Sequence, residues 1–125
     1  MARGAQLIQY KGKEIYFIDY SNIRSNSILL QTLKQTSAFR EKLLAEGKKD
    51  LLMLVDVTNF FASGEALDKL KKNGRLTKQM TKKEAVVGLK SYFTKVQIQI
   101  FRTFTKMQLK SFDQIDKAKD WLVED

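Results

Sequence analysis

The 125-residue chain contains no cysteine, no histidine and no proline. Without cysteine it can form neither disulfides nor a cysteine-based metal site, and we expect a cytoplasmic location. Without histidine it lacks the usual general base near neutral pH and the usual zinc ligand. Catalysis by a Ser-His-Asp or Cys-His arrangement is therefore excluded within this chain, and we expect neither a metal ion nor a cofactor.

Long apolar runs are also lacking. No stretch approaches the ~18 apolar residues of a membrane span. Polar and charged side chains interrupt residues 1–17, where a signal peptide would carry its apolar segment. With 43% apolar residues, a chain of this length is expected to form one domain over residues 1–125.

Acidic residues are scarce in one part of the chain. Between Lys69 and Lys110 there are twelve Lys or Arg and a single acid, Glu84. The net charge of this segment is therefore +11. Because the net charge of the whole chain is +9, the remaining residues together carry −2. Such a block can bind an anionic partner (acidic lipid, nucleotide or nucleic acid), here through Lys78, Lys82 and Lys83. The alternative, which we favour, is a solvated lysine-rich surface.

Strands and helices alternate along most of the chain. Strands are predicted at residues 6–10, 14–20, 51–57, 84–89 and 107–112, and helices at residues 28–46, from residue 63, at 91–106 and from about residue 114. The non-alternating apolar runs are typical of strands buried on both faces of a parallel sheet. The order predicts an α/β fold with a mostly parallel five-stranded sheet, an antiparallel edge strand and flanking helices.

Several local details follow from the pattern. The first helix should bury Leu29, Leu33, Thr36, Leu43 and Leu44 and end at Gly47. Asn73-Gly74 interrupts the second helical pattern, so residues 75–81 are open between a helix and a loop. Ser111 and Gln114 can form a capping box for the last helix. The sheet core should contain Phe17, Leu52, Leu54, Val55, Val86 and Val87.

Polar residues gather where the predicted strands end. Asp19 follows one strand, Asp56, Thr58 and Asn59 follow another, and Gly88 follows a third. Because ligands of open α/β sheets sit outside the carboxyl ends of the strands, these are the candidate ligand-binding residues. Asp56 can instead accept hydrogen bonds from its own turn, and Gly88 can simply permit a tight turn.

Two features lie just beyond the strand predicted at residues 51–57. Ser63 is a candidate phosphoacceptor, and it can equally be the N-cap of the following helix. Of the adjacent Phe60 and Phe61, one should be core, and the other is then available to a partner.

The stretches "GKEIYFIDYS", "LLMLVDVTNF", "KKEAVVGL" and "SFDQIDKAKDWL" together resemble the STAS superfamily, and in particular its SpoIIAA-like (STAS/SEC14-like) bacterial branch. The resemblance implies a small sheet flanked by helices and a non-enzymatic role. It implies that the chain binds a protein partner and that phosphorylation of a serine controls this binding. In the family the serine lies in an Asp-Ser-Ser-Gly turn, and Ser63-Gly64 matches the last two residues of that turn. Its SEC14-like side implies instead a pocket for a small apolar ligand.

We therefore expect a regulatory or ligand-binding module and not an enzyme, with a basic-surface module as the alternative. Formation of a homodimer is a further alternative, for which Tyr92 and Ile98 are the candidate contacts. Asp19 and Asp56 could converge as a carboxylate pair, but no motif supports catalysis by them.

Overall fold

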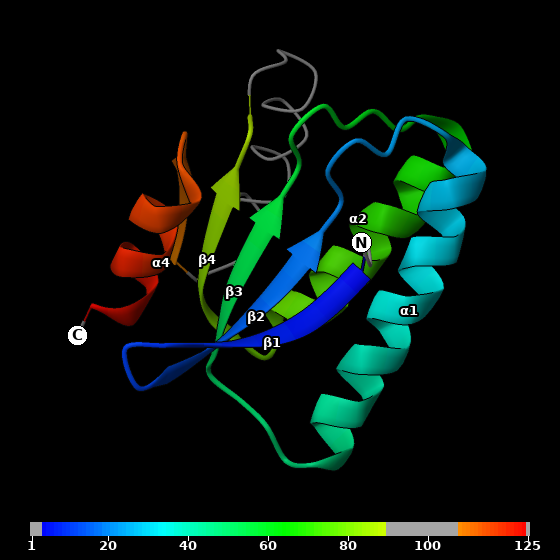
Figure 1. Cartoon of the computed structure of the whole chain (residues 1–125). Helices are drawn as coiled ribbons and strands as arrows, with labels where there is room; N and C mark the ends of the chain where they lie inside the picture. The colour runs from blue at the N-terminus through cyan, green and yellow to red at the C-terminus, as the bar shows by residue number, and fades with distance from the viewer. Residues whose placement is uncertain (1–3, 90–107, 125) are drawn as a thin grey trace.

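The computed structural model describes residues 4–89 and 108–124. Its centre is a five-stranded sheet of order β1-β2-β3-β4-β5 (Figure 1). The strands are β1 (Gly4–Tyr10), β2 (Lys13–Asp19), β3 (Leu51–Asp56), β4 (Thr81–Val87) and β5 (Gln108–Phe112). The described helices are α1 (Asn26–Ala45), α2 (Gly64–Lys78) and α4 (Ile115–Val123). The predicted helix at residues 91–106, with its candidate contacts Tyr92 and Ile98, lies outside the described residues.

One strand pair is antiparallel and the others are parallel. β1 and β2 form a hairpin in which Tyr10 pairs with Lys13. Lys11 and Gly12, between them, both have positive φ, as a two-residue type I′ turn requires. The pairs β2–β3, β3–β4 and β4–β5 are parallel. The predicted fold class, with its antiparallel edge strand, is thus confirmed.

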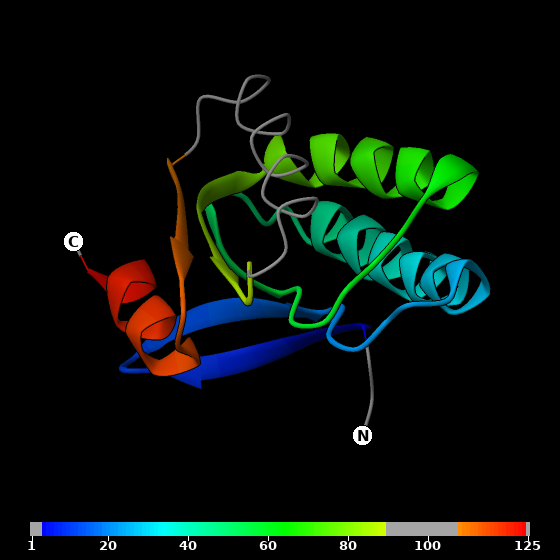
Figure 2. The same ribbon diagram turned by 90° about the horizontal axis from the view of Figure 1, so that it is seen from above.

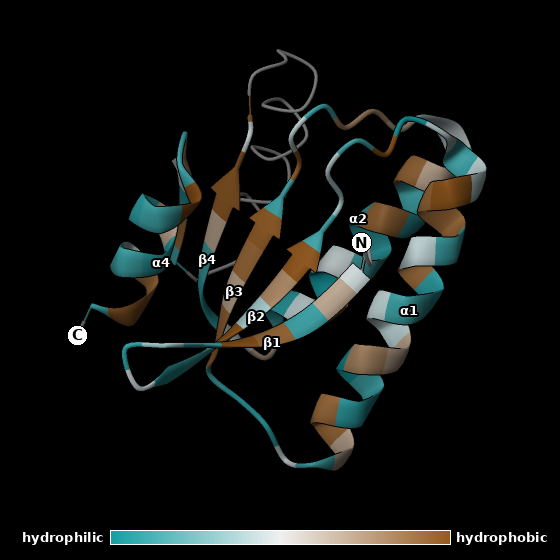
Figure 3. Cartoon of the chain, in the orientation of Figure 1, coloured by the Kyte–Doolittle hydropathy of each residue, from teal (hydrophilic) through white to brown (hydrophobic). Residues whose placement is uncertain are grey.

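The helices cover both faces of the sheet. α1 and α2 lie side by side on one face and α4 lies on the other (Figures 1 and 2). Each face has its own cluster of buried apolar side chains. The central strands contribute side chains to both clusters and are largely apolar (Figure 3). Of the predicted core, Leu54, Val86 and Val87 are buried, while Phe17, Leu52 and Val55 are half-buried and pack against the clusters.

The first helix follows the prediction except at one leucine. Ser25 caps it, with its side chain accepting from the Ile28 amide. At the other end Lys48 N donates to Leu43 O and Gly47 N to Leu44 O, the paired bonds of a Schellman motif with Gly47 at φ 75°. Leu44 was expected inside but is 51% exposed, because the inward positions run through Arg40 and Leu43 and leave Leu44 on the flank.

The second helix does not break at Asn73-Gly74. It continues to Lys78, so residues 75–78 are helical and the question left open by the sequence is answered. Asn73 is buried and bonded to α1: its Oδ1 accepts from Ser37 Oγ (3.0 Å), and its Nδ2 donates to Thr36 Oγ1 (3.3 Å). Hydrogen bonds between the helices therefore outweigh the weak helix propensity of Asn and Gly.

The predicted capping box at the last helix is wrong. Ser111 belongs to β5, and the N-cap Gln114 makes no capping bond with its side chain. The other end of α4 is held by lysines from the sheet. Lys83 Nζ donates to Trp121 O (3.1 Å) and Glu124 O (3.0 Å), and Lys13 Nζ to Val123 O (3.0 Å). Cations at these last carbonyls stabilise the helix end.

Candidate functional site

The same four-residue turn follows both β2 and β3. Residues 19–22 are Asp-Tyr-Ser-Asn and residues 56–59 are Asp-Val-Thr-Asn. In each, one carboxylate oxygen accepts from the amide (2.9 Å) and the hydroxyl (2.6 Å) of the residue two positions on. In each, the asparagine has positive φ, 60° and 54°, which asparagine adopts more readily than most residues. Asp56 thus accepts hydrogen bonds from its own turn, the alternative role that the sequence offered, and Asp19 does the same.

The two turns are bonded to each other in register. Tyr20 N donates to Asp56 O (2.9 Å) and Asn22 N donates to Thr58 O (2.8 Å). The side chains continue the pairing, since Asn59 Nδ2 donates to Asn22 Oδ1 (3.1 Å). Strand pairing therefore extends beyond the sheet and fixes one turn against the other.

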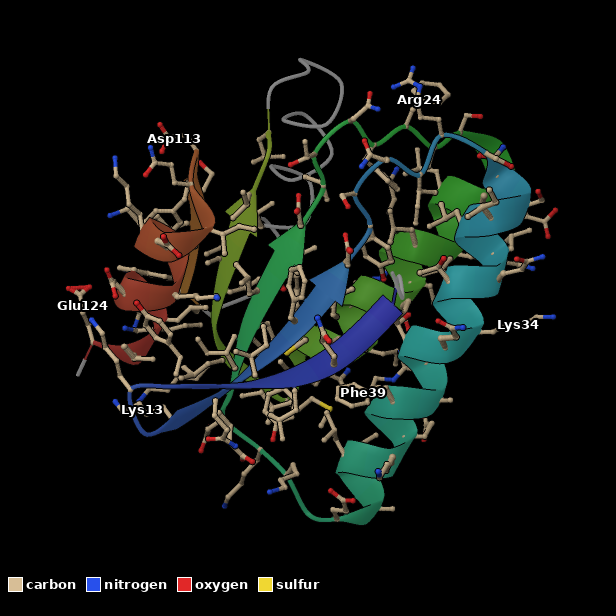
Figure 4. The ribbon with its side chains drawn as sticks, in the orientation of Figure 1. Lys13, Arg24, Lys34, Phe39, Asp113 and Glu124 are labelled. Carbon is tan, nitrogen blue, oxygen red and sulfur yellow. The ribbon has the colours of Figure 1, made fainter. Side chains whose placement is uncertain are left out.

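Further along, the paired turns present an aromatic ring to solvent. Phe61 is 41% exposed, while Phe60 beside it is buried against Tyr20 with ring centroids 6.0 Å apart. The sequence prediction that one phenylalanine is core is thus confirmed. Arg24, at the upper edge of the molecule in Figure 4, places its guanidinium 5.9 Å from the Phe61 ring centroid and donates to Asn59 Oδ1 (3.2 Å). Phe61 is accordingly an exposed ring beside a cation.

Ser63 occupies the N-cap position of α2, as the sequence predicts, but its side chain makes no capping bond to that helix. Its hydrogen bonds are instead with Asn26, the first residue of α1. Asn26 Nδ2 donates to Ser63 Oγ (3.4 Å), and Ser63 N donates to Asn26 Oδ1 (3.4 Å). The candidate phosphoacceptor therefore lies where the loop before α2 meets the start of α1, two residues beyond Phe61.

Gly88 lies where the chain leaving β4 passes close to the turn at residues 56–59. Its φ is 92°, and a Cβ built there would lie 2.6 Å from Thr58 N and 2.7 Å from Thr58 Cα. Val57 N also donates to Val87 O (2.9 Å). Glycine is needed here because the backbone of a neighbouring loop fills the space of a side chain.

The predicted site residues thus lie together, but most of their polar atoms bond within the loops. Asp19 and Asp56 are register partners, and Asp19 is only 4% exposed. Thr58 and Asn59 are exposed. The sequence interpretation passed over Arg24 and Asn26, which join the loops. The repeated Asp-x-Ser/Thr-Asn signature would have pointed to the paired turns.

The predicted anion-binding lysines do not form a surface patch. Lys78 and Lys83 are buried, and of the three only Lys82 is exposed. Lys83 serves the end of α4 as described, with its ammonium also 4.9 Å from the Trp121 ring centroid. The sequence predicted this strand from residue 84, whereas β4 begins at Thr81 and turns Lys83 toward α4. Lys78 is the last residue of α2.

Lys78 lies beside Glu84 at a small cavity between α2 and the sheet. The cavity measures about 70 Å³ and is lined by apolar residues together with Tyr20, Asn73, Thr77, Lys78 and Glu84. Burial raises the pKa of Glu84, an effect that the charge of Lys78 opposes, and burial lowers the pKa of Lys78. Burial also raises the pKa of Tyr20 to about 12, so this phenol stays protonated at neutral pH.

The described residues contain no cluster of acidic side chains placed to hold a metal ion. None of the described helices is both long enough and apolar enough to cross a membrane. The fold and its loops define a small α/β module with one mixed sheet, in which paired loops occupy the carboxyl ends of the strands.

The chain belongs to the SpoIIAA-like family, whose model matches residues 25–123. Among solved structures it is similar to an uncharacterised protein of the DUF3478 family from Shewanella loihica PV-4, which has a SpoIIAA-like fold. The TM-score is 0.74 at 18% identity, over 98% of this chain and 96% of that chain. At this identity the likeness shows the fold alone. No curated protein is similar enough in sequence to match. The resemblance found in the sequence is confirmed, and it supports a regulatory or binding module in general.

Proposed function

We propose that the chain is a non-enzymatic regulatory module that binds a protein partner through its strand-end loops, residues 19–26 and 56–63. The observation that carries the proposal is the exposed ring of Phe61, 41% accessible, on a loop fixed by hydrogen bonds to its neighbour. Aromatic side chains with an adjacent arginine are typical anchors of protein interfaces.

The loops are ordered before any partner arrives, which favours binding. Phe61 N donates to Ile23 O (3.0 Å), and Arg24 joins Asn59 and the Phe61 ring. Since these contacts already hold the surface in one conformation, association loses less conformational entropy than it would with mobile loops.

The cavity between α2 and the sheet is too small to favour a drug-sized apolar ligand at that place. A pocket for a drug-sized ligand usually measures about 300–1,000 Å³, whereas the cavity between α2 and the sheet measures about 70 Å³. The carboxylates at the strand ends accept hydrogen bonds from their own turns, so they are better explained as supports of the loops than as ligand contacts.

Ser63 is the proposed site of regulation. A phosphate there would add about two negative charges two residues from Phe61 and at the start of α2. The amino end of the helix would stabilise that charge, and the added charge would change the surface that the partner meets. We expect phosphorylation of Ser63 to alter partner affinity.

The experiment is affinity capture from cells that express the tagged chain, with captured proteins identified by mass spectrometry. Phe61→Ala should lose the specific partner, because it removes the exposed ring and leaves the buried Phe60 in place. Leu44→Ala is the matched control, since Leu44 is also an exposed apolar residue, 51% accessible, at the far end of α1. A partner captured equally by all three proteins would count against this surface.

A further inference from the structure

A second surface, separate from the strand-end loops, lies between α1 and α2. The two helices run side by side (Figure 2), and a groove of about 770 Å³ follows their seam. Leu30, Leu76 and the largely buried Leu33 form its apolar part, and Lys34, Lys69 and Lys72 form its basic part. Leu76 is 40% exposed, and Lys34 extends from α1 away from the sheet (Figure 4). No residue of the strand-end loops lines this groove.

The charge of the groove has one sign. Arg40 also lines it and is buried, with its guanidinium donating to Asn73 Oδ1 and to Glu41 Oε1 (3.3 Å). None of the described residues that line the groove is acidic. Lys69 contacts Glu65 at 3.3 Å, but both side chains are more than half exposed, and such pairs are too weak to prevent a carboxylate from another molecule from competing.

The charge argues against occupants from the chain itself. A second copy would bring a net charge of +9 to a basic surface. Residues 90–107 carry four basic residues and no acid, so their charge does not complement the groove either. An acidic partner complements it.

The shape and lining favour a helix over other anions. From Leu30 to Arg40 the groove follows about 15 Å of α1, at 1.5 Å rise per residue, which matches about three turns of a partner helix. Leucines flanked by cations accept a helix with an apolar stripe and acidic edges. Single-stranded nucleic acid usually stacks on aromatic side chains, and the described groove lining has none.

We propose that the α1–α2 groove docks an acidic amphipathic helix of a protein partner. Its apolar stripe contacts Leu30, Leu33 and Leu76, and its flanking carboxylates pair with Lys34, Lys69 and Lys72.

The test is a displayed library of helical peptides, about 18 residues long so that helices form, with leucines spaced three and four apart and all other positions random. The purified full chain is the target. Selected peptides are expected to be enriched in Asp and Glu on both sides of the leucine stripe, and their binding is expected to weaken with salt.

Variants locate the binding. The double variant Lys34→Glu/Lys72→Glu is expected to weaken the selected peptides about tenfold or more, as is usual for loss of central interface contacts. Leu76→Gln is expected to weaken them as well. The matched control Lys42→Glu/Arg75→Glu makes the same charge change on the same two helices outside the groove lining and should retain most of the affinity. Circular dichroism and thermal denaturation confirm that each variant is folded.

Several outcomes would overturn the proposal. One is selection of peptides without acidic enrichment, and another is equal weakening by the groove and control variants. A third is that the chain binds anionic phospholipid vesicles and no peptide, and that the groove variant abolishes the vesicle binding. A fourth is a dimer in sedimentation that the groove variant abolishes. Phe61→Ala should leave peptide binding unchanged, so failure here and failure of the proposed function are distinguishable.

Discussion

Substitution of Gly88 by alanine tests how closely the end of β4 packs against the loop that follows β3. Two effects add. A positive φ of 92° strains an alanine by about 1–3 kcal/mol. The new Cβ would also meet backbone atoms of Thr58 at 2.6 and 2.7 Å, and relief of such overpacking typically costs about 1–3 kcal/mol. Gly88→Ala is therefore expected to destabilise the fold by about 2–6 kcal/mol.

The matched control is Gly12→Ala. Gly12 also has positive φ, 81°, but a Cβ there has no atom within 4 Å, so only the backbone strain is added. Urea denaturation followed by Trp121 fluorescence gives the free energy of unfolding of both variants. Gly88→Ala should lose clearly more than Gly12→Ala. Equal losses would show that the β4 end and the Thr58 loop do not approach as described.

Three further predictions concern the core, a buried acid and the helix caps. Leu54→Ala should cost about 2–5 kcal/mol in urea denaturation by opening a cavity under α4, and Leu44→Ala should cost under about 0.5 kcal/mol; similar values would contradict the central position of β3. Because burial raises the pKa of Glu84, its stabilising contribution is present below the ordinary pKa of a glutamate and is lost as the pH rises through the raised value. Glu84→Gln should therefore flatten the decline of the melting temperature as the pH rises above about 4, and an unchanged profile would refute this. Ser63→Ala should change the melting temperature little, whereas Ser25→Ala should cost about 1 kcal/mol; the reverse order would be inconsistent with the caps.

The sheet was predictable because its strands carry strong local signals. Leu51–Asp56 is a short apolar run that ends on a carboxylate, and the Lys11-Gly12 turn matches its hairpin. These features depend on residues close together in the sequence. The resemblance to the SpoIIAA-like family rested on the same segments and their order.

The errors arise where contacts distant in sequence decide. Asn73 breaks a helix pattern locally, but hydrogen bonds to α1 hold it inside α2. Lys83 was placed on a basic surface, and contacts with carbonyls 38 and 41 residues away account for its burial.

The strand-end site was predictable in position but not in character. Asp19 and Asp56 were expected at the strand ends, where they lie. The hydrogen bonds of each carboxylate to its own turn are local, and for Asp56 the sequence offered this role as an alternative. The bond between Asn22 and Asn59 that joins the two turns depends instead on the register between β2 and β3. A search for short repeats would have found the shared Asp-x-Ser/Thr-Asn signature and suggested equivalent roles.

Binding of a protein partner at the strand-end loops can be measured as the dissociation constant of the purified partner. Isothermal titration with wild type, Phe61→Ala and Leu44→Ala would use the partner identified by capture. We expect Phe61→Ala to weaken binding about tenfold or more, as is usual for an interface anchor, and Leu44→Ala to leave it unchanged. Unchanged affinity in a folded Phe61→Ala protein would contradict the account.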